Sequence, residues 1–251
     1  MTKLLASVRS PVEALAAIAG GADIIDLKEP EAGALGRLPE GVLRAALAAV
    51  AGRRPTSATI GDLPLAPAPI LAAVRAMAET GVDIVKLGIF AGDATATLAA
   101  LGAAAREGIR LVAVCFADRQ PDFDLIHRCA DAGFYGVMLD TADKRAGSLT
   151  RHLPPESLAR FLALARERRL LAGLAGSLAA SDLPTLLPLA PDFLGFRSAL
   201  TSGGRAAPLD PAAVARLRAA LDGAPSSATA AAGAQSAAIA ATSPSAGMTL
   251  A

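Results

Sequence analysis

Gly-Ala-Asp-Ile-Ile-Asp-Leu-Lys at residues 21–28 and Gly-Val-Asp-Ile-Val-Lys-Leu-Gly at residues 81–88 repeat one pattern. In each copy a glycine stands where a preceding helix would end, and a short apolar run follows that has the length of a buried strand. The run is continuous rather than alternating, which is typical of parallel strands covered by helices. The pattern therefore predicts helix-to-strand units of an α/β protein.

Apolar runs of this kind occur eight times, and segments of helical period separate them. The predicted strands are Leu4–Val8, Asp23–Leu27, Thr56–Ile60, Asp83–Leu87, Arg110–Phe116, Gly136–Leu139, Leu170–Leu174 and Phe193–Phe196. The predicted helices are Pro11–Ala19, Pro39–Ala51, Pro67–Glu79, Ala94–Glu107, Phe123–Ala132, Pro155–Arg168, Ser181–Pro188 and Pro211–Leu221. Eight such units predict a single (β/α)8 TIM barrel over residues 1–222. An open doubly wound sheet is the alternative, but no GxGxxG motif follows the first strand.

The composition changes after Asp222. Residues 223–251 contain no charged residue and consist mostly of Ala, Ser, Gly, Thr and Pro. Such a segment is typical of a low-complexity tail, and we place it outside the barrel domain as a disordered C-terminal extension.

Removal of residues 223–251 is expected to leave folding and activity nearly unchanged, because the segment has neither charge nor an apolar stripe to bury. Melting temperature and turnover, compared between the full chain and a chain that ends at Asp222, test this expectation. A large fall in either quantity on truncation would mean that the tail docks on the barrel.

The composition excludes several classes of protein. Apolar residues make up 53% of the chain, and 24 basic residues balance 23 acidic ones, so no basic excess favours nucleic acid. No uninterrupted apolar run of membrane-spanning length and no signal peptide are recognisable, so no membrane partner is expected. Two cysteines and two histidines provide neither a disulfide framework nor a metal-ligand spacing. We expect a cytoplasmic protein without a metal.

Lysine is rare in this chain, which makes its positions informative. Of the 24 basic residues only four are lysines, Lys3, Lys28, Lys86 and Lys144. The last three lie on or just past predicted strands two, four and six, at the end of the barrel where active sites lie. Two alternatives stay open: a bias of composition toward Arg that left four lysines by chance, and ion pairs that only brace the sheet.

Strand parity places two aspartates with these lysines. Side chains alternate along a strand, so Asp26 and Lys28 share a face. Counted from the preceding glycine, Asp26 has the same offset as Lys86, and Lys28 has the same offset as Asp140. We therefore expect these four side chains to point into the mouth of the barrel, with Lys144 nearby.

An amine in such a cluster can act as a nucleophile. A free lysine has a pKa of about 10.4, and neighbouring ammonium groups and burial can lower it to roughly 7–8. The neutral amine can then attack an aldehyde and form an imine, while Asp26 and Asp140 move protons and offset the charge. Three lysines in one barrel mouth are an expensive way to brace a fold, so catalysis is favoured.

The loops after the last two predicted strands indicate a phosphate site. In barrels of this kind, loops after strands seven and eight commonly bind phosphate through backbone N–H groups. Gly176 and Ser177 follow the seventh strand, and Arg197 and Ser198 follow the eighth. They supply small residues, hydroxyl groups and a cation, so the expected partner is a small-molecule phosphosugar.

Five motifs, in order along the chain, resemble the (5-formylfuran-3-yl)methyl phosphate synthase family, also called 4-(hydroxymethyl)-2-furancarboxaldehyde-phosphate synthase. The resemblance covers residues 1 to about 222. The motifs are Ala-Asp-Ile-Ile-Asp-Leu-Lys-Glu-Pro-Glu-Ala-Gly-Ala-Leu-Gly (22–36), Ser-Ala-Thr-Ile-Gly-Asp-Leu-Pro (57–64), Asp-Ile-Val-Lys-Leu-Gly (83–88), Met-Leu-Asp-Thr-Ala-Asp-Lys (138–144) and Leu-Ala-Gly-Ser-Leu (174–178).

The resemblance implies a (β/α)8 barrel that condenses two molecules of glyceraldehyde 3-phosphate, with loss of one phosphate and two waters. It implies a carbon–oxygen lyase without a metal or organic cofactor, which makes the furan of methanofuran or of a related one-carbon carrier. The family's imine-forming lysine falls on Lys28 and its proton-accepting lysine on Lys86. Its supporting residues fall on Asp26, Asp140 and Lys144. Assembly into a homo-oligomer is an open alternative to a monomer.

Two other functions stay open. An ordinary class I aldolase would use the same imine, whereas a non-catalytic phosphosugar-binding barrel would use its lysines only to hold anions. Trapping of an imine with borohydride separates the binding protein from both enzymes, and analysis of the product separates the two enzymes.

Overall fold

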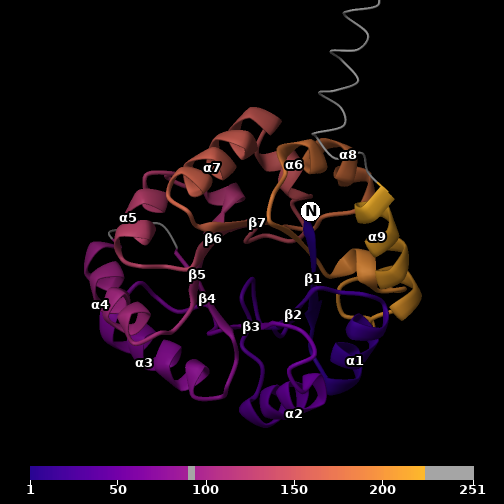
Figure 1. The fold of residues 1–251 in the computed structure, drawn as a ribbon, viewed down its shortest axis with the longest axis horizontal. Helices are drawn as coiled ribbons and strands as arrows, with labels where there is room; N and C mark the ends of the chain where they lie inside the picture. The colour runs from indigo at the N-terminus through magenta and orange to yellow at the C-terminus, as the bar shows by residue number, and fades with distance from the viewer. Residues whose placement is uncertain (90–93, 224–251) are drawn as a thin grey trace, which may run out of the picture.

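The computed structural model describes residues 1–89 and 94–223. Eight parallel strands form a closed barrel in which each strand pairs with its sequence neighbours and β1 pairs with β8 (Figure 1). The strands are β1 (Lys3–Val8), β2 (Ile24–Leu27), β3 (Thr56–Thr59), β4 (Ile84–Gly88), β5 (Leu111–Phe116), β6 (Gly136–Asp140), β7 (Leu171–Leu174) and β8 (Phe193–Phe196). The predicted TIM barrel is confirmed, and the closed strand order excludes the open doubly wound sheet.

Helices surround the barrel as an outer ring (Figure 1). The α-helices are α1 (Pro11–Ala19), α2 (Glu40–Val50), α3 (Pro67–Ala78), α4 (Thr95–Arg106), α5 (Leu125–Asp131), α6 (Leu149–His152), α7 (Pro155–Glu167), α8 (Leu183–Leu186) and α9 (Pro211–Gly223). Short 3₁₀ helices are η1 (Ala117–Arg119), η2 (Ala180–Asp182), η3 (Leu187–Leu189) and η4 (Ser198–Leu200). Gly223 ends α9, and the rest of the predicted tail lies outside the described residues.

One predicted helix differs from the structure. The sequence predicts a continuous helix over Ser181–Pro188, but the chain forms η2, α8 and η3 in succession. Pro188 has no backbone N–H to donate, so the α-helical hydrogen-bond pattern of α8 does not continue past Leu186. The sequence analysis also predicts no helix between β6 and α7, where the structure has α6, a single helical turn.

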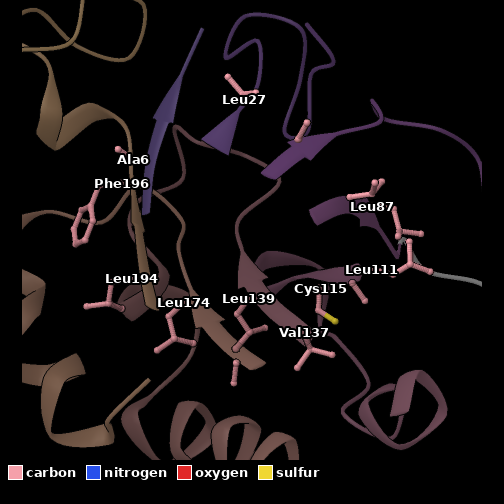
Figure 2. Close-up of a cluster of buried hydrophobic side chains, with 14 of the residues drawn as sticks. Ala6, Leu27, Leu87, Leu111, Cys115, Val137, Leu139, Leu174, Leu194 and Phe196 are labelled. Atoms are coloured by element: carbon pink, nitrogen blue, oxygen red, sulfur yellow. The ribbon is translucent and has the colours of Figure 1, made fainter. Parts of the chain in front are cut away.

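Apolar side chains cover both faces of the strands, which explains the continuous apolar runs. Leu139, Leu174 and Leu194 belong to the layer between strands and helices (Figure 2). Alternate residues such as Leu5 and Met138 form a second cluster inside the barrel. The interior of the barrel is thus a packed core rather than an open channel.

Three aspartates join neighbouring strands at the end of the barrel where the strands begin. Each aspartate lies just before an even-numbered strand and accepts a backbone N–H from the start of the strand before it. The three hydrogen bonds join Asp23 to Leu4 at 2.7 Å, Asp83 to Thr56 at 2.8 Å and Asp192 to Ala172 at 2.7 Å. Asp23 and Asp83 occupy the same place in the two repeated segments 21–28 and 81–88, so this pattern also serves to pair the strands.

Within residues 1–89 and 94–223, no helix is long and apolar enough to span a lipid bilayer.

Candidate functional site

Four of the five predicted catalytic side chains line the C-terminal mouth of the barrel, and the fifth, Lys86, contacts Asp26 from the interior. Asp26 lies on β2 and Lys28 directly after it, Lys86 lies on β4, and Asp140 ends β6. These four residues are buried, with at most 6% of their surface exposed, and Lys144 lies half-buried in the segment after β6. The side chains that strand parity brings together do lie close to one another, because Asp26 contacts Lys86 and Lys28 lies beside Asp140.

The two buried pairs are unequal. Lys86 Nζ lies 2.6 Å from Asp26 Oδ1, which is a close ion pair. Lys28 Nζ lies 3.8 Å from Asp140 Oδ2, beyond hydrogen-bond distance, while Lys144 Nζ forms a direct hydrogen bond to Asp140 Oδ1. Asp140 therefore lies between two lysine amines. It accepts a hydrogen bond from Lys144, whereas Lys28 lies beyond hydrogen-bond distance. Of the three amines, that of Lys28 is the least tightly held by a carboxylate.

Two serines complete the surroundings of Asp26, and sequence reasoning missed both. Ser57 Oγ donates to Asp26 Oδ1 at 2.6 Å, and Ser7 Oγ donates to Oδ2 at 3.0 Å. Both serines stand opposite Asp26 in the register of the neighbouring strands. Burial alone would raise the pKa of Asp26, but the charges of Lys86 and Lys28 and hydrogen bonds to its oxygens hold it below its usual value.

The electrostatics of the mouth favour a neutral amine on Lys28. The pKa of Lys28 is lowered to about 8: burial is the largest cause and the ammonium groups of Lys144 and Lys86 add to it, while the charges of Asp140 and Asp26 oppose the shift. Burial would raise the pKa of Asp140, but Lys144 and Lys28 bring it to about 2. The site therefore holds a fixed carboxylate beside an amine that is partly neutral near physiological pH.

The loop that carries Lys144 is fixed from two sides. Asp118, after β5, accepts the backbone N–H groups of Ala142 at 2.7 Å and Asp143 at 2.8 Å. Burial would raise the pKa of Asp118, but these backbone donors lower it. From the other side, Ser177 Oγ donates to the carbonyl of Lys144 at 3.1 Å. Ser177 thus positions the lysine, and the phosphate contact expected of its hydroxyl stays a prediction.

The turn after β7 depends on a glycine. Gly176 has φ +112°, and a Cβ atom there would lie 2.9 Å from Thr141 Cγ2 and 3.0 Å from the backbone nitrogen of Thr141. Ser177 follows with φ +49°, also left-handed. This conformation brings the turn against the loop after β6, so the segments after β6 and β7 form one wall of the mouth.

Arg197 is buried, and all five of its N–H groups point at protein oxygens. The contacts are Nη1 to Glu13 at 2.5 Å and to the Ser7 carbonyl at 3.1 Å, Nη2 to Glu13 at 3.1 Å and to the Ala207 carbonyl at 2.8 Å, and Nε to the Arg205 carbonyl at 2.9 Å. In this arrangement the guanidinium has no donor left for a substrate. The phosphate contact expected of Arg197 finds no support in these bonds, and neighbouring Ser198 is an exposed residue at the start of η4.

Glu13→Ala is expected to lower the free energy of unfolding by about 3–5 kcal/mol, because it leaves the buried guanidinium of Arg197 without its counter-charge. Urea denaturation measures the change. Glu40→Ala is the matched control, since it removes an exposed partner of Arg44 on α2 and is expected to cost less than about 1 kcal/mol. Equal losses in the two variants would contradict the structural role of the Glu13 pair.

Every predicted site residue except Lys86 lines one pocket at the mouth. Lys86 lies instead beside an interior cavity, together with Ser57 and Ile84. Arg205, from the segment between β8 and α9, also lines the mouth pocket and was not predicted. Across residues 1–89 and 94–223, His, Cys, Asp and Glu side chains do not gather in a group that could ligate a metal.

Comparison with known proteins points to one family. A family model described as 4-HFC-P synthase matches residues 4–218. The (5-formylfuran-3-yl)methyl phosphate synthase of Archaeoglobus fulgidus is 34% identical over 235 residues, which cover 88% of this chain and 100% of that protein. The synthase of Methanopyrus kandleri is 35% identical, over 80% of this chain and 90% of its own. A candidate synthase of Methylorubrum extorquens is 44% identical, over 85% and 89%.

Solved structures match the barrel at lower identity. Phosphoribosyl anthranilate isomerase from Thermus thermophilus superposes with a TM-score of 0.64 at 17% identity, covering 88% of this chain and 98% of that chain. A 3-hexulose-6-phosphate synthase superposes with a TM-score of 0.59 at 21% identity, covering 87% and 99%. At these identities the likeness shows the fold alone.

Proposed function

This chain belongs to the 4-HFC-P synthase family, and from that membership and its lysine cluster we propose that it condenses two molecules of glyceraldehyde 3-phosphate to (5-formylfuran-3-yl)methyl phosphate. One phosphate and two waters leave, which balances the atoms and makes the enzyme a carbon–oxygen lyase. The observation that carries the proposal is Lys28, a buried amine with a pKa of about 8 in the mouth pocket. Such an amine is suited to attack an aldehyde.

The first step forms the imine. The neutral amine of Lys28 attacks the aldehyde carbon and forms a C–N bond, and the carbinolamine then loses water as its C–O bond breaks and the nitrogen lone pair forms the C=N bond. Lys144, bonded to Asp140, supplies the proton that the departing hydroxyl needs. The Asp140 carboxylate stays ionised, because its pKa is about 2, and its charge stabilises the protonated imine 3.8 Å from the original amine position.

The second step removes a proton from the carbon next to the imine. Lys86 first passes its ammonium proton to Asp26, whose Oδ1 lies 2.6 Å away, and the neutral amine then takes the proton from the carbon. Ser7 and Ser57 hold Asp26 in place through its two oxygens. Elimination and carbon–carbon bond formation with the second triose then build the ring, and aromatisation drives the sequence toward the furan.

The decisive experiment incubates the purified full chain with glyceraldehyde 3-phosphate and identifies the product by mass spectrometry. The expected result is a furan aldehyde phosphate, with one inorganic phosphate released for each furan formed. A six-carbon sugar phosphate without a furan would identify a class I aldolase instead. Absence of both a product and a borohydride-stable adduct would leave a phosphosugar-binding barrel.

The rate of imine formation is expected to rise with pH through about 8 and to level off above it, because only the neutral amine of Lys28 attacks. At two units below that pKa, about 1% of the amine is neutral. Single-turnover trapping with borohydride, from roughly pH 6 to 10, measures the profile. A trapping rate that does not change across this range would rule out Lys28 as the titrating nucleophile.

A further inference from the structure

Arg205 has surroundings unlike those of Arg197. Its Nε donates to the carbonyl of Pro30 at 3.1 Å, which lies two residues past Lys28 in sequence. Its Nη2 is buried and, within the part of the chain that the structure describes, has no hydrogen-bond partner. A buried donor on a charged group is costly when it is not satisfied, so such groups usually meet an acceptor. Nη2 therefore has an unused capacity to donate a hydrogen bond, in a residue that lines the mouth pocket.

Arg205 lies within electrostatic reach of the lysine cluster. It lines the mouth pocket together with Lys28, Asp140 and Lys144. Burial lowers the pKa of Arg205 below its usual value and the charge of Arg197 also lowers it, while the charges of Asp140 and Glu29 raise it. Glu13 neutralises Arg197, but among the described residues no carboxylate forms an ion pair with Arg205. The pocket therefore carries an excess of cationic side chains.

We propose that the guanidinium of Arg205 binds the phosphate group of the triose phosphate whose aldehyde reacts with Lys28. The proposal rests on the proposed function and names the residue that selects a phosphorylated substrate. A guanidinium presents fixed N–H donors that match phosphate oxygens, and a phosphate dianion offsets the excess of cations in the pocket. Because Arg205 and Lys28 line the same pocket, one three-carbon chain can present its phosphate to the first and its aldehyde to the second.

Arg197 has a supporting role in this arrangement. Its Nε donates a hydrogen bond to the backbone carbonyl of Arg205 at 2.9 Å, and its Nη2 donates one to the backbone carbonyl of Ala207 at 2.8 Å. Glu13 in turn fixes Arg197 through two hydrogen bonds. The buried ion pair thus sets the backbone of the segment that carries Arg205. The proposal thus assigns to Arg205 the phosphate contact that the sequence predicted for Arg197. Arg197 is a positioning residue, which acts through the backbone of the segment that carries Arg205.

Arg205→Gln in the full chain tests the proposal, because it removes the charge and keeps a polar side chain. Titration calorimetry with inorganic phosphate is expected to show a Kd that is about 10- to 100-fold higher than in the wild type, the range for loss of a charge-assisted hydrogen bond. The KM for glyceraldehyde 3-phosphate is expected to rise by a similar factor. Borohydride trapping of unphosphorylated glyceraldehyde on Lys28 is expected to proceed at the wild-type rate.

Two further variants make the outcome specific. Arg216→Gln, on the exposed side of α9, is the matched control and is expected to leave both constants unchanged. Arg205→Lys keeps the charge and is expected to show a smaller loss than Arg205→Gln, and it replaces that variant if Arg205→Gln does not fold. Unchanged phosphate affinity and KM in the folded Arg205 variants would overturn the assignment.

Failure of the proposed function gives a different result from failure of this inference. If the wild type neither traps nor converts glyceraldehyde 3-phosphate, the proposed function fails, and the phosphate titration still decides whether Arg205 binds the anion. If the wild type converts the substrate and the Arg205 variants do so with the same KM, the role of Arg205 alone is overturned.

Discussion

Lys28→Arg is expected to reduce turnover by several orders of magnitude, on the scale seen when an essential member of a catalytic unit is removed. Arginine keeps the positive charge and most of the length, so it can still attract a phosphate. It cannot form an imine at neutral pH, because its guanidinium does not lose its proton. Steady-state turnover of glyceraldehyde 3-phosphate and borohydride trapping measure the loss.

Lys3→Arg is the matched control for this substitution. Lys3 is an exposed residue at the start of β1, at the opposite end of the barrel, so its replacement is expected to leave turnover unchanged. The Lys28→Arg protein is expected to fold and to bind inorganic phosphate. Retention of more than a few per cent of wild-type turnover in that variant would contradict a covalent mechanism at this residue.

Lys86→Met is expected to lower turnover by about 10²- to 10⁴-fold, the usual contribution of a general base, while an imine still forms on Lys28. Methionine fills most of the space of the lysine stem, and Ser7 and Ser57 remain to bind the buried Asp26. Peptide mapping after borohydride reduction locates the adduct, and circular dichroism checks the fold. An adduct on Lys86 in the wild-type protein would exchange the roles of the two lysines.

The sequence predicted the barrel well because the signal for buried parallel strands is local. Each of the eight predicted strands overlaps an observed strand, and Phe193–Phe196 has the same bounds in both. The predicted helix Ser181–Pro188 is divided in the structure. It contains two prolines within a few residues, and their effect on the backbone competes with the helical preference of the rest of the segment. The family resemblance read from five motifs is confirmed by the match over residues 4–218.

The gathering of the two lysines and two aspartates could also be predicted, because equal offsets from a glycine translate into equal heights in the barrel. Ser7 and Ser57 were missed although the same parity rule applies to them, since small polar residues on strands are common. Arg197 and Arg205 could not be told apart from sequence. Their roles depend on Glu13, which lies 184 residues before Arg197, and on a loop without periodicity.

The aspartates that fasten the strands away from the mouth separate two tasks in this molecule. Asp23, Asp83 and Asp192 pair the strand beginnings by hydrogen bonds that involve none of the residues around Lys28. Substitutions of the side chains around Lys28 therefore leave these hydrogen bonds at the strand beginnings intact. Because the strand contacts and the side chains at the mouth are separate, the side chains at the mouth can evolve without loss of those contacts. The mouth loops, rather than the strands, are therefore the place to engineer acceptance of other aldehydes.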